Sequence, residues 1–352
     1  MIKVKNMSEQ KKYEPYHELT KQGALINILI TGFGLAIGVI LLGLGLNEAF
    51  FTSNATLFAI FDIITKFGDE ELYIVFFCIF YFGVDKKFAK RMMIGFLVSL
   101  HLTDFSKSLF MDPRPASNFI EDAAGKAEGY GFPSGHTSGT LSFWGYTFFN
   151  FKGEEKKKRI GWRTFAMFLI IMVPISRLII GVHDLQDIVG GFMLGFLVIT
   201  AYMYFEPKFS SIFGAWSVKK KILIGVACSL GIWLLSSLLL FVFSLNNPDW
   251  LGFQQDIHDM SVSSGILMGA AIAFPLEEEH VKYDPNKLDL VKTLLATLIG
   301  LVITFGMYFL LSFLFGLAPG IYFITRGFKY CIFIVIAALG VPPLLKKIFK
   351  ME

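Results

Sequence analysis

The chain has 352 residues, of which 54% are hydrophobic and 17% charged, with a net charge of +4 at neutral pH. Its mean hydropathy is +0.60. A composition this apolar excludes an ordinary soluble domain and predicts an integral membrane protein in contact with the lipid bilayer, with no nucleic acid as a partner. The three cysteines, Cys78, Cys228 and Cys331, lie in apolar runs without metal-ligand spacing, so we expect buried thiols.

Apolar runs of about twenty residues, the length that crosses a bilayer, follow one another along the chain and predict an all-α polytopic membrane bundle. The polar segment 1–23 comes first and does not resemble a cleaved signal. The segment 54–68 is too short to cross and predicts a helix at the membrane interface. We expect ten spans, at 24–46, 71–85, 89–107, 137–151, 164–182, 185–205, 222–245, 260–275, 293–316 and 328–345.

Lysine and arginine collect in alternate connections between the predicted spans. Of the 32 basic residues, 25 fall in the two terminal segments and in the connections 85–91, 152–163, 207–221 and 276–292. Positive charge marks the cytoplasmic side, which predicts cytoplasmic termini and an outward-facing segment 108–136. Three outer cations, Lys107, Arg114 and Arg177, lie at or near span ends, where positive charge is costly without an anionic partner.

Three polar stretches converge on the predicted outer face: KSLFMDPRP (107–115), PSGH (133–136) and SRLIIGVHDLQD (176–187). Taken singly, each has a structural interpretation, because cations anchor span ends and a Pro-Ser pair starts a helix. Together they supply cations, a hydroxyl and a glycine amide that suit a phosphate group. They also supply two histidines and a carboxylate that suit nucleophilic and acid catalysis.

In order and spacing, these stretches resemble the three-part signature of the type 2 phosphatidic acid phosphatase superfamily. The matching positions are Lys107-x6-Arg114-Pro115, Pro133-Ser134-Gly135-His136 and Ser176-Arg177-x5-His183-x3-Asp187. The resemblance covers about residues 55–206 and implies a six-span core with its site at the outer ends of the helices. It also implies a phosphatase that uses no metal or other cofactor and passes through a phosphohistidine.

The resemblance implies a role for each matching residue. His183 would be the nucleophile, Asp187 would orient it, and His136 would protonate the leaving group and later take a proton from water. The other positions would hold the phosphate oxygens: Lys107, Arg114, Arg177, the Ser134 hydroxyl and the Gly135 amide.

Neighbouring polar residues receive no catalytic role. Asp112 and Asp184 are interpreted as loop carboxylates, and His101 as a structural histidine. No Asp, Glu or His cluster in the sequence has the spacing of a metal site, so we expect none. The remaining histidines lie outside the three stretches: His17, His258 and His280.

The chain is expected to divide into a cytoplasmic segment (1–23), a six-span phosphatase core (24–206) and a membrane extension of about four spans (207–352). The extension contains no second set of the motifs. We interpret it as structural or as a contact in a homodimer. The alternative is that it widens a lipid groove beside the site or helps a product to cross the bilayer.

The expected function is hydrolysis of a phosphomonoester or pyrophosphate of a membrane lipid, at the outer face of a plasma membrane. Two alternatives stay open: a lipid phosphate transporter that uses the same cations, and phosphoryl transfer to an acceptor other than water. The stretches MDPRP (111–115) and GYGFPSGH (129–136) resemble those of long-chain-base phosphate phosphatases. The lysine-rich loops favour a prokaryotic plasma membrane.

Overall fold

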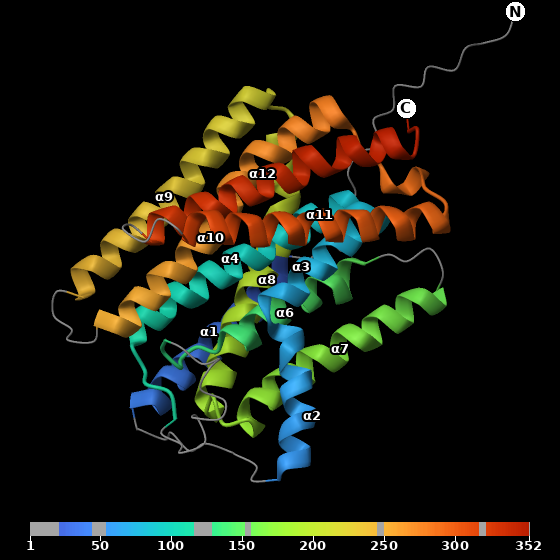
Figure 1. Cartoon of the computed structure of the whole chain (residues 1–352). Helices are drawn as coiled ribbons and strands as arrows, with labels where there is room; N and C mark the ends of the chain where they lie inside the picture. The colour runs from blue at the N-terminus through green and yellow to red at the C-terminus, as the bar shows by residue number, and fades with distance from the viewer. Residues whose placement is uncertain are drawn as a thin grey trace, which may run out of the picture.

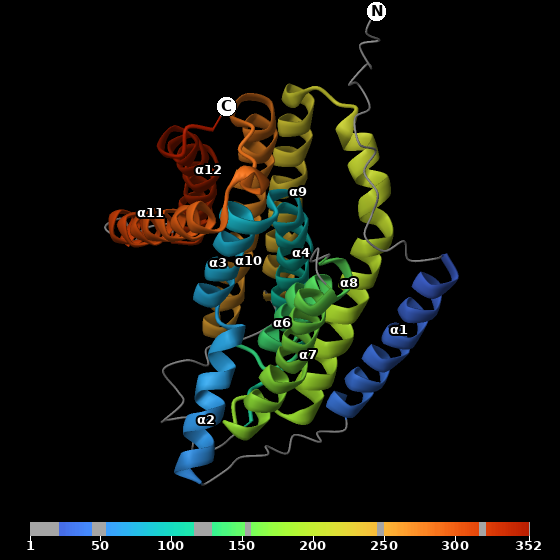
Figure 2. The same cartoon turned by 90° about the vertical axis from the view of Figure 1, so that its right-hand side faces the viewer.

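A computed structural model describes residues 21–43, 54–115, 129–151, 156–244, 250–316 and 322–351. Within these ranges the regular structure is helical, which confirms the all-α bundle (Figure 1). Helices α4, α9 and α10 run alongside one another in both views, and α1 lies against the outer side of α8 (Figures 1 and 2).

The helices follow the expected order along the chain. Short 3-10 segments lie at Lys66–Gly68 and Pro285–Lys287, and π-helical turns at Ile79–Val84 and Glu277–Val281. The α-helices are α1 (Lys21–Gly43), α2 (Ala55–Thr65), α3 (Glu70–Cys78), α4 (Lys86–Phe110), α6 (Gly135–Asn150), α7 (Lys156–Ile179), α8 (Leu185–Gly214), α9 (Val218–Ser244), α10 (Trp250–Leu276), α11 (Leu290–Gly316) and α12 (Tyr322–Ile348).

Six helical stretches in the described part are long and apolar enough to cross a membrane, fewer than the ten spans expected. They are Ile160–Ile179, Leu185–Gly214, Val218–Val242, Asp259–Lys287, Leu290–Gly316 and Ile324–Ile348. Three of the other expected spans fall on α3, α4 and α6. These helices are not among the six, because α3 and α6 are short and α4 carries charges at both ends. The first, 24–46, runs beyond the described residues. The chain is a multi-pass membrane protein, and the short helix α6 lies inside the bundle.

Helix α6 lies among the helices that carry the three motif stretches and contacts α4, α7 and α8. Its 16 residues are rich in glycine, serine and threonine, and the large side chains of Phe143 and Trp144 are fully buried. A Cβ on Gly195 of α8 would lie 2.8 Å from the carbonyl oxygen of Ser138. Small residues therefore allow close helix contact here, and a helix buried on all sides need not span the bilayer alone.

The extension packs against the core through α10, which contacts α4, α9 and α12. Glycines allow the close approach of α10 and α12. A Cβ on Gly269 would lie 2.5 Å from the carbonyl oxygen of Cys331, and one on Gly265 would overlap the carbonyl of Gly327. This is the small-residue packing typical of membrane helices.

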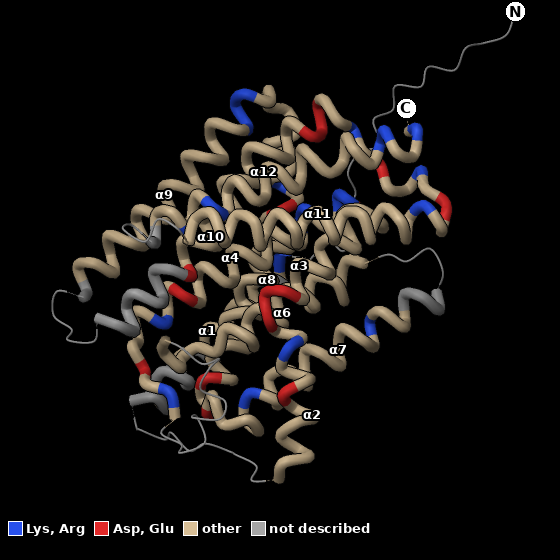
Figure 3. The backbone as a smooth tube through the Cα atoms, viewed as in Figure 1, with Lys and Arg blue, Asp and Glu red and all other residues tan. Residues whose placement is uncertain are grey.

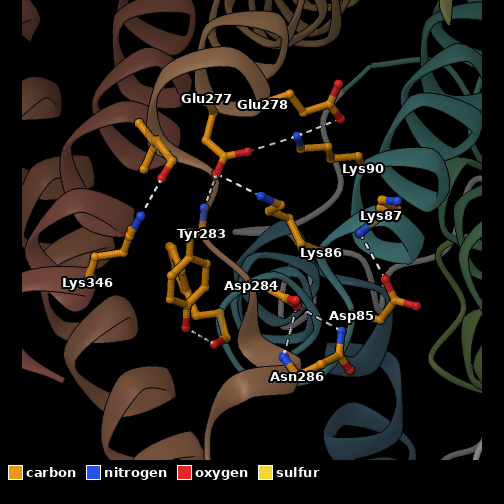
Figure 4. A network of polar contacts seen from close by, with 12 residues as sticks. Asp85, Lys86, Lys87, Lys90, Glu277, Glu278, Tyr283, Asp284, Asn286 and Lys346 are labelled. Atoms are coloured by element: carbon orange, nitrogen blue, oxygen red, sulfur yellow. Dashed lines mark hydrogen bonds and ion pairs between the residues drawn. The ribbon is translucent and has the colours of Figure 1, made fainter. Parts of the chain in front are cut away.

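A buried ion network joins the extension to the start of α4. The fully buried Glu277 carboxylate accepts hydrogen bonds from Lys86 (2.7 Å), from Lys90 (3.1 Å) and from the backbone N–H of Tyr283 (3.0 Å; Figure 4). The Tyr283 hydroxyl donates to the carbonyl of Phe82. Because a buried charge is costly without partners, these contacts fix the extension in one position on the core.

His101 of α4 is structural, as expected. Its ring is buried, and its two nitrogens contact the hydroxyls of Ser263 in α10 (3.1 Å) and Ser236 in α9 (2.9 Å). These contacts join α4 to the two extension helices α9 and α10. The sequence could not pair this histidine with serines more than 130 positions away.

Charge is confined to the first turns of α9 and α11, and long uncharged stretches follow (Figure 3). The outer faces of these helices are apolar, with Leu234 and Phe309 more than 60% exposed. The expectation of three buried thiols is correct for Cys78 and Cys331 but wrong for Cys228, which is exposed on α9. Lipid covers such a face, so an apolar run in a membrane protein does not imply burial in protein.

Candidate active site

Most of the predicted site residues meet around one cavity of ≈620 Å³. Two of them, Ser134 and Asp187, are fully buried behind its wall. The cavity is lined by Lys107, Arg114, Gly135, His136, Arg177 and His183. Segments separated by up to 76 positions in the sequence thus supply one cluster of cations and imidazoles.

His183 lies in the turn between α7 and α8 and is held by the start of α8. Its Nδ1 donates to Asp187 Oδ2 at 2.8 Å, and the same oxygen accepts the backbone N–H of Asp184 at 3.3 Å. The Asp184 side chain accepts the backbone N–H of Asp187 at 2.9 Å, which completes a capping box. The helix begins at Leu185, so a helix cap rather than a continuous helical face brings His183 and Asp187 together.

Arg114 fixes the other side of the same imidazole. Its Nη1 donates to His183 Nε2 (3.1 Å) and to the carbonyl of Val182 (3.0 Å), and its Nε donates to the carbonyl of Gly129 (3.1 Å). With Nδ1–H directed at Asp187, the lone pair of Nε2 faces the arginine and the cavity. Burial, and then the charges of Arg114 and Arg177, lower the pKa of His183 well below its ordinary value. The imidazole is therefore neutral at pH 7, the form that can act as a nucleophile.

His136 lies in the first turn of α6, on the same cavity. Its Nε2 lies 3.0 Å from Oδ1 of Asp69, which precedes α3. A Cβ on the adjacent Gly68 would lie 2.6 Å from His136 Cδ2, so the glycine makes room for the ring. Burial, and then the charge of Arg177, lower the pKa of His136. Sequence reasoning missed Asp69, because it lies in a segment without any motif.

Arg177 is a buried cation with unused hydrogen-bonding capacity. One of its terminal nitrogens donates to the hydroxyl of Thr65 at 3.0 Å. Its Nε has no hydrogen-bond partner among the described residues, although the side chain is buried and lines the cavity. A buried, charged donor of this kind suits an anionic ligand in the cavity.

Ser134 caps α6, and Gly135 is the first residue of that helix. The Ser134 hydroxyl oxygen lies 3.1 Å from the Thr137 hydroxyl and faces it rather than the cavity. Its predicted contact with phosphate stays a prediction. The Gly135 backbone does line the cavity, at a helix N-terminus where an anion is favoured.

Three buried carboxylates come together behind His183: Asp112, Asp184 and Asp187. One oxygen from each lies within 4.8 Å of the others, a grouping that could hold a metal ion. The expectation that no acidic cluster has a metal-site arrangement is therefore wrong, because folding joins the motif loops that the sequence keeps apart. Asp184 and Asp187 are engaged in the capping box that positions His183.

An all-α membrane bundle with two imidazoles and three cations around one cavity has the features of a membrane protein that handles phosphate groups. Family models are consistent with this class. Residues 88–211 match the PAP2 superfamily, and residues 262–352 match the transmembrane extension of PAP2 superfamily phosphatases. The chain belongs to the PAP2 superfamily.

The chain is similar to several curated proteins that are named phosphatases. The chain is 24% identical to sphingosine-1-phosphate phosphatase 1 of Mus musculus, covering 64% of this chain and 50% of the relative. It is 25% identical to the Rattus norvegicus protein of the same name (66% and 52% coverage), and 24% identical to lipid phosphate phosphatase delta of Arabidopsis thaliana (44% and 40%). The chain thus spans about half the length of these relatives or less. No solved structure gave a significant match.

Proposed function

We propose that the protein is a membrane phosphatase that hydrolyses a lipid phosphate through a phosphohistidine on His183. One observation carries this proposal: the His183 imidazole is held between Asp187 (2.8 Å) and Arg114 (3.1 Å) on the wall of a cation-lined cavity. Phosphate binding alone would need the cations but not a carboxylate that orients an imidazole.

The proposed reaction has two displacements. His183 Nε2 attacks phosphorus, the bond from phosphorus to the lipid oxygen breaks, and the departing alkoxide takes a proton from His136, which has received that proton from the substrate monoanion. A water molecule then gives a proton to His136 while its oxygen attacks phosphorus, and the bond from nitrogen to phosphorus breaks. Lipid alcohol and inorganic phosphate leave, the phosphate takes the proton from His136, and both imidazoles return to their initial neutral state.

The cations would stabilise the charge on the transferring group. Lys107 and Arg177 line the cavity beside the two histidines, and Arg114 would exchange its contact with His183 Nε2 for one with a phosphate oxygen. Because Lys107 and Arg177 already line the cavity, only the Arg114 contact would need to change when substrate binds.

We propose a long-chain-base phosphate as the substrate. The names of the Mus musculus and Rattus norvegicus relatives support this choice, together with the MDPRP and GYGFPSGH stretches. Phosphatidic acid, phosphatidylglycerol phosphate and undecaprenyl pyrophosphate are the competing substrates for the assay. Phosphate release by the purified protein from equal amounts of these lipids would rank them.

We propose that the reaction needs no metal, since side chains fill every role in the two displacements. Phosphate release should survive EDTA, and vanadate should inhibit because it adopts the geometry of the transferring phosphoryl group. Loss of activity in EDTA with recovery in magnesium would contradict this mechanism and direct attention to the carboxylates Asp112, Asp184 and Asp187.

We also propose that the site faces outward from a plasma membrane, with both termini in the cytoplasm, from the uneven distribution of basic residues. A cysteine at Pro113, an exposed loop position next to Arg114, tests this orientation. It should react with an impermeant thiol reagent in intact cells, with the unsubstituted chain as the control. Reaction only after permeabilisation would reverse the orientation.

The variant His183→Ala separates the phosphatase from a transporter. Removal of a covalent nucleophile should lower turnover by about 10⁴-fold or more. Lipid phosphate binding in detergent should persist, because all three cations remain. Near-normal hydrolysis by the variant would refute the nucleophile, whereas binding and vesicle transport by a wild-type protein that never releases phosphate would favour the transporter.

A further inference from the structure

The cavity that contains the two histidines extends far from them into the membrane part of the protein. At one end its wall contains the cations proposed to bind phosphate. Elsewhere the wall consists mainly of apolar side chains, with the charged side chains of Glu70, Glu71, Asp104, Asp259 and Arg326 also on it. Its volume of ≈620 Å³ lies within the range of pockets that enclose a whole ligand, about 300–1,000 Å³. A phosphate group alone would occupy only its polar end.

One face of α4 lines the cavity along most of the helix. Eight residues of α4 line it, and six of them are spaced alternately by three and four residues: Lys90, Met93, Leu97, Leu100, Asp104 and Lys107, with Ala89 and Phe96 beside them. This spacing keeps them on a single face, and the rise of 1.5 Å per residue gives a length of about 26 Å between the first and the last. This length is close to the hydrocarbon thickness of a bilayer, about 30 Å.

The extension supplies the opposite wall. On α12, Tyr330, Ile334 and Ala337 line the cavity at helical spacing, and on α10 Ile266 and Phe274 do so. Both helices pack tightly through the glycines described above. Without the extension, this face of α4 would be open to lipid along its whole length.

The inner end of the cavity is closed by charge. Lys90 Nζ lies 4.9 Å from the centre of the Phe274 ring and contacts Glu277 and Glu278, each at 3.1 Å (Figure 4). An apolar ligand that reached this point could not pass without separating these ions. The closed end lies one cavity length from the phosphate cradle.

We propose that this cavity holds a single hydrocarbon chain of the lipid phosphate, and that the inner end formed by Lys90, Phe274 and Ala337 limits the length of that chain. The proposal rests on the proposed function, because the phosphate in the cradle fixes one end of the lipid. Continuity with the cradle identifies the occupant as the chain attached to that phosphate. The extension then determines specificity, and a lipid with two long chains would leave one of them outside.

Photolabelling tests the occupant without depending on turnover. An eighteen-carbon alkyl phosphate with a diazirine at its terminal carbon is bound to His183→Ala protein in detergent, irradiated and mapped by mass spectrometry. Labels should fall on the inner-end peptides that contain Lys90, Phe274 or Ala337. Labels confined to lipid-facing positions such as Ile332 and Leu344 would overturn the proposal, even if the protein proves to be a phosphatase.

A narrowing variant tests the length limit. Ala337→Phe should lower the ratio of kcat/KM for eighteen-carbon over ten-carbon substrate by about tenfold, within the usual cost of overpacking. Hydrolysis of water-soluble p-nitrophenyl phosphate should stay within twofold. The matched control is Ile332→Phe, which adds a ring on the lipid-facing side of the same helix and should change neither value.

The widening variant Phe274→Leu should have the opposite effect and raise the same ratio. It also keeps the test decisive if Ala337→Phe does not fold. Equal losses on all three substrates, or an unchanged ratio in both folded variants, would refute the length limit. Failure of the wild type to release phosphate from either alkyl phosphate would instead refute the proposed function.

Discussion

The Nδ1 atom of His183 lies 2.8 Å from Oδ2 of Asp187, and both side chains are buried. The carboxylate fixes the tautomer of the ring and would stabilise the positive charge that develops on it during attack. Asp187→Asn should therefore fold normally and lower kcat by about 10²–10⁴-fold, as loss of an orienting carboxylate does in other enzymes.

The control for that variant is Asp289→Asn, which changes an exposed carboxylate of the extension in the same way. The measurement is phosphate release, together with lipid phosphate binding. Binding should be retained by Asp187→Asn, and equal kcat values for the two variants would mean that Asp187 does not orient the nucleophile.

Gly68 makes room for the His136 ring. A methyl group there would lie 2.6 Å from His136 Cδ2, so Gly68→Ala should displace the imidazole. A displacement of about 1 Å costs on the order of 10²-fold in rate when geometry controls proton transfer. Hydrolysis of an alkyl phosphate should fall by this order, and p-nitrophenyl phosphate less, because its leaving group needs no proton.

The matched change Gly161→Ala lies on α7, where a Cβ meets nothing within 4 Å, and should leave both rates unchanged. Equal losses on both substrates in Gly68→Ala would indicate a disturbed site rather than a misplaced acid.

The pKa shifts predict how the rate depends on pH. Burial and the charge of Arg177 lower the pKa of His136, so without substrate the His136 ring is neutral at pH 7. The proton for the leaving group must then arrive with the substrate monoanion, whose second pKa is about 6. Raising the pH removes this proton, so kcat/KM for an alkyl phosphate should fall about tenfold per pH unit above about pH 6.

The protonation of His183 should not change the rate over the same pH range, because its lowered pKa keeps the imidazole neutral there. His136→Ala should respond less to pH with p-nitrophenyl phosphate as substrate. A wild-type profile that stays flat to pH 8 would show that His136 holds its own proton in the complex.

The buried Glu277 predicts how the extension contributes to stability. Glu277→Gln leaves Lys86 and Lys90 without their shared carboxylate, and removal of one partner from a buried ion group typically costs about 3–5 kcal/mol. Thermal unfolding in detergent should therefore occur at a lower temperature. Asp289→Asn, which breaks an exposed pair with Lys292, should leave the Tm unchanged.

The sequence predicts the site better than it predicts the membrane crossing. Spacing alone locates Lys107, Arg114 and His183, because their chemistry depends on residue type and on a short stretch of chain. It does not reveal Asp69 or Thr65, which reach the site only through the packing of α2 and α3 against the motif helices.

The predicted spans fail for a related reason. Hydropathy describes contact with lipid, but α6 is surrounded by protein and is only 16 residues long. The acidic group behind His183 was missed because its members come from two loops. Local patterns therefore identify the residues that gather around the cavity, whereas helix depth and partner residues depend on the assembled bundle.

The ion network around Glu277 also constrains how the gene can vary. Lys86 and Lys90 lie at the start of α4, yet the carboxylate that neutralises them comes from a segment 187 or more positions later. A shortened gene that stopped before residue 277 would leave two buried ammonium groups facing lipid. Natural homologues that lack the extension should therefore carry uncharged side chains at the positions of Lys86 and Lys90, and the two lysines should be gained or lost together with the glutamate.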